Sequence, residues 1–438
     1  MFCMLTVIVF GVGETQAQTS DTVWSLKQVI EYALHGNTDI KKQNLEMLKT
    51  KYNIEEYRSD ALPQVNGSLA YNNSPLLAKQ LLPGEIFGQP GVLIPVQFGV
   101  KNTFNGSVQL TQQVFNFQYK AGLAAAKKAL ELAEFNEKYT REEIIYTIAS
   151  TYYQALISGK QIKIVEANLD RINTGLKIAQ VQFDNKIIRK IDLDQYKVNR
   201  TNLLTDLGNA ELSFQQQLDV LKIYMGYPLD STLQVSDSVS EQALFIAENS
   251  VKDNPSLALL KTQEELKNIE IKNIRAGYYP KISASANYGF NSQFNKLRKS
   301  DVNTSPNAAL GVSVSIPIFD GFRKRRQVQQ RELEVKSLQL DQQLTENQLS
   351  MQYNIALKTY AQNKKSYDAQ KGNLELAENV YNTMNNNYKL GISNLTELNN
   401  TEVSLKEAQT KYLTALLQIK LTELDILKAN GKMEMLVN

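Results

Sequence analysis

The sequence has almost none of the residues from which metal sites and redox centres are built. It contains one cysteine, Cys3, and one histidine, His35, in 438 residues. A lone cysteine excludes an intrachain disulfide, and a lone histidine excludes the histidine pairs that hold catalytic zinc, so we expect His35 to be a polar residue near a helix end. The glycine-rich phosphate loop and the GxSxG and HExxH signatures are also missing. The sequence therefore predicts no cofactor and no metal, and it disfavours an enzyme.

An excess of charge of one sign is lacking too. The 48 Lys and Arg residues nearly balance the 45 Asp and Glu residues. Without a strongly basic face, nothing predicts a nucleic-acid partner. The densest basic cluster is 323–326, with the sequence Arg-Lys-Arg-Arg. We interpret it as a helix start near an interface, and the alternative is a contact with nucleic acid or lipid.

Long apolar runs are missing except at the N-terminus. Residues 1–17 are typical of a signal peptide, with an apolar stretch from Phe2 to Val12 and small residues at Thr15 and Ala17. A membrane anchor is the alternative, but this stretch falls short of the roughly 20 residues that span a bilayer. We therefore expect export, and we expect no membrane-spanning helix after residue 17.

The chain repeats itself. At an offset of 217, the segment 37–71 matches 254–288, with Asn37 on Asn254 and Pro63 on Pro280. At an offset of 204 or 205 the match continues through 115–226 and 319–431. A period of about 200 residues is far longer than a solenoid unit, so the pattern indicates one large unit that was duplicated and fused. We predict a first repeat at 18–225, a linker at 226–253 and a second repeat at 254–438.

Most of each repeat is predicted to be helical. Residues 118–185 and 322–387 lack proline, and their apolar positions step by three and four, which is typical of long helices that pack along a seam. A return helix should follow each, giving antiparallel hairpins at about 118–224 and 322–428. Shorter helices are expected at 25–62 and 254–279. Long helices of this kind suit a protein that spans a distance.

Four short segments alternate with period two instead, at about 64–71, 104–112, 281–288 and 308–316. Each has one apolar face and one small polar face, which fits either a strand of an outer-membrane barrel or a half-buried sheet. Irregular loops are expected at 72–102 and 289–306. Four strands cannot close a barrel alone, so a membrane location would require several chains to share one barrel.

These features together resemble the TolC-type outer-membrane efflux proteins over nearly the whole chain. The resemblance is carried by the duplicated plan, by the strand entries at 62–65 and 279–282, by the strand exit at 316–321 and by the turn at 388–391. It implies a mainly α fold with a small β part: a homotrimer whose long hairpins form an α-helical barrel, continued by a shared twelve-stranded transmembrane β-barrel. It also implies the outer membrane of a Gram-negative bacterium as location, with the helices in the periplasm and outer-membrane lipid around the strands. The function would be a passive exit duct for an inner-membrane pump and a periplasmic adaptor, in efflux or type I secretion.

The resemblance further implies a gate at the hairpin turns. Tyr388 matches the gate tyrosine, Asp192 a tip aspartate and Glu397 an acid that forms a ring around the pore. Asp192 and Tyr388, on neighbouring hairpins, are expected to tie the tips together by hydrogen bonds. Lys186 replaces the family's turn glycine, and Ser393 stands where a gating arginine is usual, so Lys186 and Arg189 are candidates for the missing positive partner. The turn residues expected to contact the adaptor are Phe183, Ile187, Gly391 and Ile392.

Two alternatives stay open at this point. Asp192 and Glu397 could be ordinary acidic caps, because acids are favoured at helix N-termini in any case. The whole chain could be a periplasmic adaptor or structural coiled-coil protein, although an adaptor carries one hairpin and this chain repeats it. The transported substrate cannot be deduced from the sequence.

Overall fold

The computed structural model describes residues 23–236, 251–296, 298 and 301–437. The expected signal peptide, 1–17, and the central part of the expected linker, 237–250, lie outside the described residues. The chain divides into two compact units. The first, here named the hairpin unit, comprises residues 1–41, 140–254 and 349–438, and the second, the strand unit, comprises 42–139 and 255–348.

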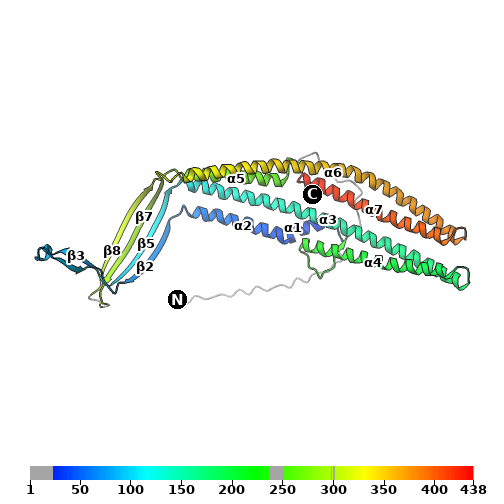
Figure 1. The fold of residues 1–438 in the computed structure, drawn as a ribbon, viewed down its shortest axis with the longest axis horizontal. Helices are drawn as coiled ribbons and strands as arrows, with labels where there is room; N and C mark the ends of the chain where they lie inside the picture. The colour runs from blue at the N-terminus through cyan, green and yellow to red at the C-terminus, as the bar shows by residue number, and fades with distance from the viewer. Residues whose placement is uncertain (1–22, 237–250, 297, 299–300, 438) are drawn as a thin grey trace, which may run out of the picture. The chain divides into compact units, whose positions relative to one another are not determined.

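The strand unit contains one four-stranded antiparallel sheet in the order β2-β5-β7-β8 (Figure 1). Its strands are β2 (Gln64–Asn73), β5 (Asn102–Phe115), β7 (Lys281–Phe294) and β8 (Asn303–Ser315). All four were expected, but β7 and β8 are longer than the sequence pattern indicates. Their added parts pair through polar side chains, as in the 2.7 Å hydrogen bond between Ser292 and Thr304, so they lack the apolar alternation that reveals a strand. The expected loop 289–306 is therefore too long, because β7 ends at Phe294 and β8 begins at Asn303.

The two faces of the sheet differ as the alternation predicts. On one face, serine hydroxyls meet across neighbouring strands, with Ser68 2.9 Å from Ser107 and Ser283 2.8 Å from Ser313. The other face exposes apolar side chains such as Leu69, whose exposed fraction is 74%. An exposed apolar face of this kind needs a partner or a lipid environment to cover it.

The segment 72–102 is not the irregular loop that was expected. It contains the antiparallel pair β3 (Lys79–Pro83) and β4 (Leu93–Gln97), joined through the short 3-10 helix η1 (Gly84–Phe87). The prolines in this segment had suggested loop structure. In a two-stranded ribbon, however, each strand has a free edge, and a proline that faces that edge removes no ladder hydrogen bond.

Seven helices account for most of the rest of the described chain: α1 (Leu26–Gly36), α2 (Thr38–Ser59), α3 (Phe117–Asp184), α4 (Lys190–Met225), α5 (Pro255–Ala276), α6 (Arg323–Lys389) and α7 (Leu395–Ala429). At 1.5 Å per residue, the 68 residues of α3 and the 67 of α6 correspond to about 100 Å each. The hairpins α3–α4 and α6–α7 match the expected ones. No helix among the described residues has an apolar stretch that could cross a bilayer.

The expected single helix 25–62 is wrong, because Asn37 divides it into α1 and α2. Asn37 has an extended backbone, and its side-chain oxygen accepts hydrogen bonds from the backbone N–H groups of Asp39 and Ile40 at the start of α2. Its amide group donates to the carbonyl of Tyr224, 2.7 Å away, at the end of α4. Asn254, its counterpart in the second repeat, donates likewise to the end of α7. The repeated asparagine therefore joins the start of one helix to the end of another in both repeats.

The main core of the hairpin unit lies where α1, α3, α4 and α7 meet. Its members are fully or nearly buried, and they include Ile30, Ile148, Leu221 and Leu424. Short elements add to this region: β1 (Val23–Trp24) pairs in parallel with β6 (Gln234–Val235), and the 3-10 helices η2 (Val251–Asp253) and η3 (Met433–Leu436) flank α5 and α7 in sequence. The sequence pattern did not predict the β1–β6 pair. Two residues per strand are too short to show an alternation.

Candidate functional site at the hairpin tips

Both hairpins turn through the same backbone motif. In the first, the N–H of Lys186 donates to the carbonyl of Phe183 and the N–H of Ile187 to that of Gln182; in the second, Gly391 and Ile392 do the same with Tyr388 and Asn387. This pair of bonds defines a Schellman motif, which requires a left-handed residue at its turning point. That residue is Gly391, with φ 73°, in one tip and Lys186, with φ 58°, in the other. The left-handed conformation costs roughly 1–2 kcal/mol at Lys186, because of its Cβ atom, and no such cost arises at Gly391.

The acids Asp192 and Glu397 lie in the first turns of the two return helices, and Glu397 forms a reciprocal cap with Asn394. The carboxylate of Glu397 accepts from the backbone N–H of Asn394, 3.2 Å away, whose side chain accepts from the N–H of Glu397 at 2.9 Å. Asp192 accepts from the backbone N–H of Arg189 at 3.1 Å and also from its guanidinium group. This side-chain hydrogen bond is the main reason why the pKa of Asp192 lies below its usual value. Arg189 therefore forms a local ion pair with Asp192. Glu397 is exposed and makes no ion pair among the described residues.

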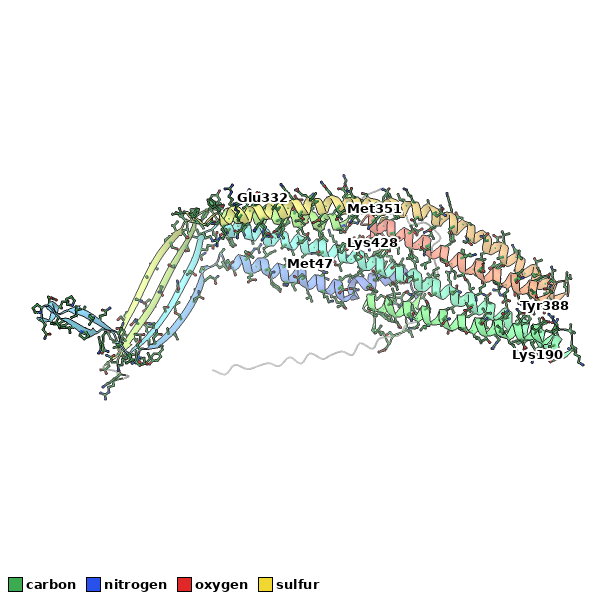
Figure 2. The ribbon with its side chains drawn as sticks, in the orientation of Figure 1. Met47, Lys190, Glu332, Met351, Tyr388 and Lys428 are labelled. Atoms are coloured by element: carbon green, nitrogen blue, oxygen red, sulfur yellow. The ribbon has the colours of Figure 1, made fainter. Side chains whose placement is uncertain are left out.

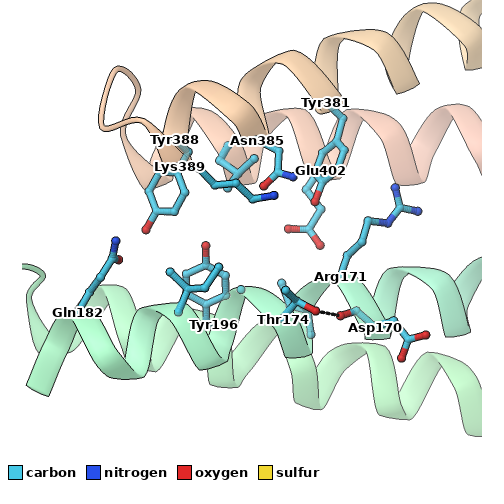
Figure 3. A pocket seen from close by; sticks show the side chains of 14 residues that line it. Asp170, Arg171, Thr174, Gln182, Tyr196, Tyr381, Asn385, Tyr388, Lys389 and Glu402 are labelled. Atoms are coloured by element: carbon cyan, nitrogen blue, oxygen red, sulfur yellow. Dashed lines mark hydrogen bonds between the residues drawn. The ribbon is translucent and has the colours of Figure 1, made fainter.

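Tyr388 is the predicted residue that reaches from one hairpin to the other. It packs against a cluster in the first hairpin that includes Leu193 and Tyr196, and also against Tyr381 and Leu398 of its own hairpin. Its hydroxyl points toward the first hairpin, where the hydroxyl of Tyr196 faces it (Figure 3). Tyr388 therefore contacts both hairpins of the chain, whereas among the described residues Asp192 bonds only within its own hairpin.

The partner of Tyr388, Tyr196, has a site prepared for its ring. A Cβ atom built on Gly175 of α3 would come within 2.6 Å of the ring of Tyr196, so only glycine leaves the ring enough space. Tyr196 is 5% exposed. Burial, and after it the nearby Tyr388, raises the pKa of Tyr196 well above its usual value. The hydroxyl of Tyr196 therefore stays neutral at any physiological pH and can act as a hydrogen-bond donor.

A second contact between the hairpins involves charged groups. The guanidinium group of Arg171 lies 5.2 Å from the ring centre of Tyr381 and donates a 2.6 Å hydrogen bond to Asn168. Glu402 of α7 faces the same region (Figure 3). Burial raises the pKa of Glu402, and the positive charges of Arg171 and Lys406 oppose that shift. The carboxylate makes no ion pair among the described residues. One turn further along α7, however, Lys406 forms an ion pair with Asp206 of α4, so a salt bridge joins the two hairpins beside Glu402.

Together these side chains surround a cavity of about 530 Å³ between the hairpins, with α3 and α4 on one side and α6 and α7 on the other (Figure 3). It is lined by Asp170, Arg171, Ile172, Thr174, Gly175, Ile178, Gln182, Tyr196, Tyr381, Asn385, Tyr388, Lys389, Leu398 and Glu402. The side-chain oxygen of Gln182 is buried there and has no hydrogen-bond partner in the part of the chain that the structure describes. A cavity and an unsatisfied acceptor leave the two hairpins incompletely packed against each other, which favours a contact that can open.

The remaining predicted site residues lie at the turns themselves. Ile187 and Ile392 are exposed at equivalent positions of the two tips, beside Lys186 and Gly391. Phe183 is partly buried and packs against the cluster of the first hairpin, so it is less accessible than the isoleucines. Lys190 and Tyr388, labelled in Figure 2, mark the ends of the two hairpins.

Sequence reasoning missed Tyr196, Arg171, Gly175 and Glu402. The duplication could not reveal them, because at an offset of 205 Tyr196 falls on Thr401 and Arg171 on Leu376. Gly175 was the available signal: a glycine inside a long helix lowers helix stability and often has a packing reason. Its partner ring, however, becomes visible only when α3 and α4 are paired in three dimensions.

Comparisons with known proteins agree with this geometry. The family model for outer membrane efflux proteins matches residues 29–226 and 247–432. The chain is 21% identical to the outer membrane protein TolC of Escherichia coli strain K12 over 457 residues, covering 98% of this chain and 88% of that protein. It is 19% identical to the outer membrane efflux protein BepC of Brucella suis over 341 residues, covering 76% and 73%.

Solved structures show the same fold. The outer membrane channel CmeC of Campylobacter jejuni superposes with a TM-score of 0.74 at 17% identity, covering 93% of this chain and 86% of that one. CusC, whose structures concern folding and transmembrane channel formation, gives 0.75 at 16% identity and covers 95% of each chain. Because the family model matches both repeats and most of the sequence, the chain belongs to the outer membrane efflux protein family, the TolC-type exit ducts of the Gram-negative outer membrane whose helical part lies in the periplasm.

Proposed function

We propose that three copies of this chain share one twelve-stranded barrel and that the hairpin tips form its periplasmic gate. The observation that supports the barrel best is the pair of open edges. Among the described strands, β2 and β8 each pair on one side only, and both are exposed along their whole length. Unpaired backbone groups cost several kcal/mol each in lipid, so both edges need a strand from another copy. Three sheets of four strands give an even-numbered antiparallel barrel of ordinary size.

Cross-linking tests this closure. The only native cysteine, Cys3, lies in the predicted signal peptide. In the processed chain, only the engineered cysteines could therefore form disulfides. Val65→Cys or Leu69→Cys on β2, combined with Leu310→Cys or Val314→Cys on β8, should give a covalent trimer on a non-reducing gel. A central strand has no free edge, so Val108→Cys on β5 combined with Val314→Cys should leave monomers. A chain that is monomeric in detergent, or a trimer that no edge pair cross-links, would overturn the shared barrel.

At the tips, three-fold symmetry would bring three copies of the exposed Glu397 around one axis. Like charges in a confined mouth attract cations and hold anions back. Tyr388 would keep the hairpins together in the closed state, and Asp192 with its partner Arg189 would fix the start of α4, the helix that carries Tyr196. Each hydrogen bond would contribute about 0.5–1.5 kcal/mol. The gate is thus proposed to open when the contact between Tyr388 and Tyr196 is lost and the hairpins part.

Single-channel recording in planar bilayers tests the gate. The double variant Asp192→Ala with Tyr388→Phe should conduct more than the parent protein, because it removes one cap and one hydroxyl from the tips. Asp230→Ala with Tyr52→Phe is a matched control with exposed residues away from the turns. If the tip variant conducts like the parent and like this control while remaining trimeric, the gate does not reside in these two residues.

The duct needs a source of energy and a connection to it, since neither a nucleotide-binding motif nor a redox group occurs in the sequence. We propose that an inner-membrane pump supplies the energy and that a periplasmic adaptor docks at the turns. The exposed Ile187 and Ile392 offer apolar contacts there, and Gly391 lets a partner approach the backbone closely.

A further inference from the structure

The link between β8 and α6 contains a strained turn. Gly321 and Phe322 both have φ 64°. For glycine this left-handed conformation is ordinary, but for a bulky aromatic residue it is an outlier that costs roughly 1–2 kcal/mol. The ring of Phe322 makes an edge contact with that of Phe319, 5.5 Å away, and remains 58% exposed. A strained residue whose ring stays exposed gains little within the chain, so its conformation needs another explanation.

Exposed apolar side chains lead up to this turn from the strand. The apolar face of β8 includes Val312 and is followed by Ile316, both exposed. Beyond the end of the strand, Ile318 is 94% exposed and Phe319 is 75% exposed. Ile318, Phe319 and Phe322 are here named the apolar turn. They line a hollow of about 250 Å³ together with Tyr278, Pro317, Asp320, Lys324 and Arg325.

Positive charge lies directly beside the apolar turn. Arg323, Arg325 and Arg326 at the start of α6 are exposed. Arg326 donates a hydrogen bond to Gln329, and no ion pair neutralises any of the three guanidinium groups in the part of the chain that the structure describes. Lys324 differs from them. It is tied to Asp320 at 2.9 Å and lies over the ring of Tyr278, so it stabilises the turn itself.

The first repeat shows that the turn does not require this arrangement. At the offset of 204 that aligns Phe115 with Phe319, the positions of the three arginines hold Tyr119, Ala121 and Gly122. There α3 begins at Phe117, two residues after β5 ends, without a strained aromatic residue and without a basic cluster. A strand can therefore pass into a long helix in this fold without these features. The arginines and Phe322 are specific to the second repeat.

We propose that the apolar turn and the three arginines bind anionic phospholipid at the periplasmic surface of the outer membrane. The inference rests on the proposed barrel, which places the apolar face of β8 in lipid. The apolar turn would extend that face into the acyl region near the surface, where aromatic residues are enriched. The guanidinium forks would bind the phosphate oxygens of the headgroups, for which they are geometrically suited. A nucleic-acid partner is less consistent with this site, because the arginines adjoin exposed aliphatic and phenyl groups.

Tryptophan fluorescence tests the position of the turn. In a Trp24→Phe background, which removes the only native tryptophan, Phe322→Trp and Val312→Trp are reconstituted separately into vesicles that contain brominated phosphatidylglycerol. Bromines near the headgroup should quench Phe322→Trp more strongly than deep bromines, whereas Val312→Trp should respond more strongly to deep ones. If Val312→Trp is quenched and Phe322→Trp is not, the lipid site is refuted alone. If neither is quenched, the barrel proposal fails as well.

Lipid titration of the detergent-solubilised protein, followed by native mass spectrometry, tests the arginines. Replacing Arg323, Arg325 and Arg326 by Gln should weaken phosphatidylglycerol binding at least about tenfold, given the usual contribution of each basic residue near an anionic surface. The matched control replaces three exposed lysines of the same helix by Gln, Lys358, Lys364 and Lys365, and should bind like the parent.

Equal weakening in both triple variants would mean unspecific attraction and would overturn the site. Equal binding of phosphatidylcholine and phosphatidylglycerol by the parent would do the same, as would displacement of the lipid by millimolar inorganic phosphate, which would indicate a free-anion site. If the triple variant does not assemble, Arg325→Gln alone gives the comparison, because its side chain makes no hydrogen bond or ion pair among the described residues. It should bind phosphatidylglycerol several-fold less tightly than the parent, and unchanged binding would refute the site.

Discussion

Gly175→Ala should open the proposed gate. The new methyl group would stand 2.6 Å from the ring of Tyr196, well inside van der Waals contact. Tyr196 cannot easily move away, since it is 5% exposed and packs within the cluster of the first hairpin. The ring would have to shift toward Tyr388, which faces it from the second hairpin (Figure 3). The substitution therefore acts on the contact that we propose holds the closed state.

The magnitude follows from two opposing effects. Alanine stabilises a helix interior by about 1 kcal/mol relative to glycine, but it does so in the closed and the open state alike, so this term does not alter the gate equilibrium. Overpacking costs about 1–3 kcal/mol while Tyr388 confines the ring of Tyr196. This cost is relieved when the hairpins part, because the ring can then move into the space that Tyr388 leaves. The closed state should thus lose 1–3 kcal/mol relative to the open one, which corresponds to a shift of about 5- to 150-fold toward opening.

Single-channel recording measures this shift as open probability. Gly208→Ala is the matched control, because Gly208 lies inside α4 and a Cβ atom there would meet nothing within 4 Å. It should leave open probability unchanged and raise the midpoint of thermal unfolding slightly. If Gly175→Ala and Gly208→Ala have the same open probability, the contact of Tyr196 with Tyr388 does not control the gate. Adding Tyr196→Ser to Gly175→Ala should not close the channel again, since the contact is then absent.

Three further predictions concern the sheet, the pore and the core. Leu69→Arg should cost roughly 2–4 kcal/mol near the bilayer midplane and reduce trimer yield from membranes, whereas the neighbouring Ser68→Arg would face water and be tolerated; equal losses would indicate a sheet buried on both faces. Glu397→Ala should reduce cation selectivity, measured as the reversal potential in a salt gradient, and an unchanged potential would leave Glu397 as a helix cap only. Burial raises the pKa of Glu142 to about 7, so the folded state binds this proton more tightly than the unfolded chain, whose value is 4.5. The resulting stability is present below about pH 4.5 and is lost as the pH rises toward 7, so the thermal midpoint should fall over that window, and Glu142→Gln, which keeps an acceptor for the N–H of Met433, should flatten the fall.

The large elements could be predicted because their signals are long. Dozens of proline-free residues with three-four spacing specify α3 and α6. Because the sequence is duplicated, each of these patterns occurs twice. The family match over both hairpins also removes the alternative of a periplasmic adaptor. Short elements failed for the opposite reason. The break between α1 and α2 at Asn37 depends on one side chain that bonds to Tyr224, which is 187 positions away. A local sequence pattern cannot predict such a distant contact.

The candidate site divides in the same way. Asp192, Glu397 and Gly391 were recognisable from the resemblance to the efflux family, whose tip acids and turn glycine align with them. Tyr196 and Glu402 were not recognisable, since their importance arises from which hairpin faces which. Their spacing in the sequence is simply that of a helix face.

The fusion of two repeats has a consequence for how such a ring can evolve. In a ring of six unfused copies, every substitution would appear six times, so a charge at one tip would be a charge at all of them. Fusion halves that multiplicity and lets neighbours diverge: Lys186 stands at one tip where Gly391 stands at the next, and the basic cluster at 323–326 has no counterpart after β5. In the trimer that we propose, alternate positions around the ring can thus specialise, one kind keeping a relaxed backbone and the other carrying charge. Each repeat meanwhile retains its own asparagine joint at Asn37 or Asn254.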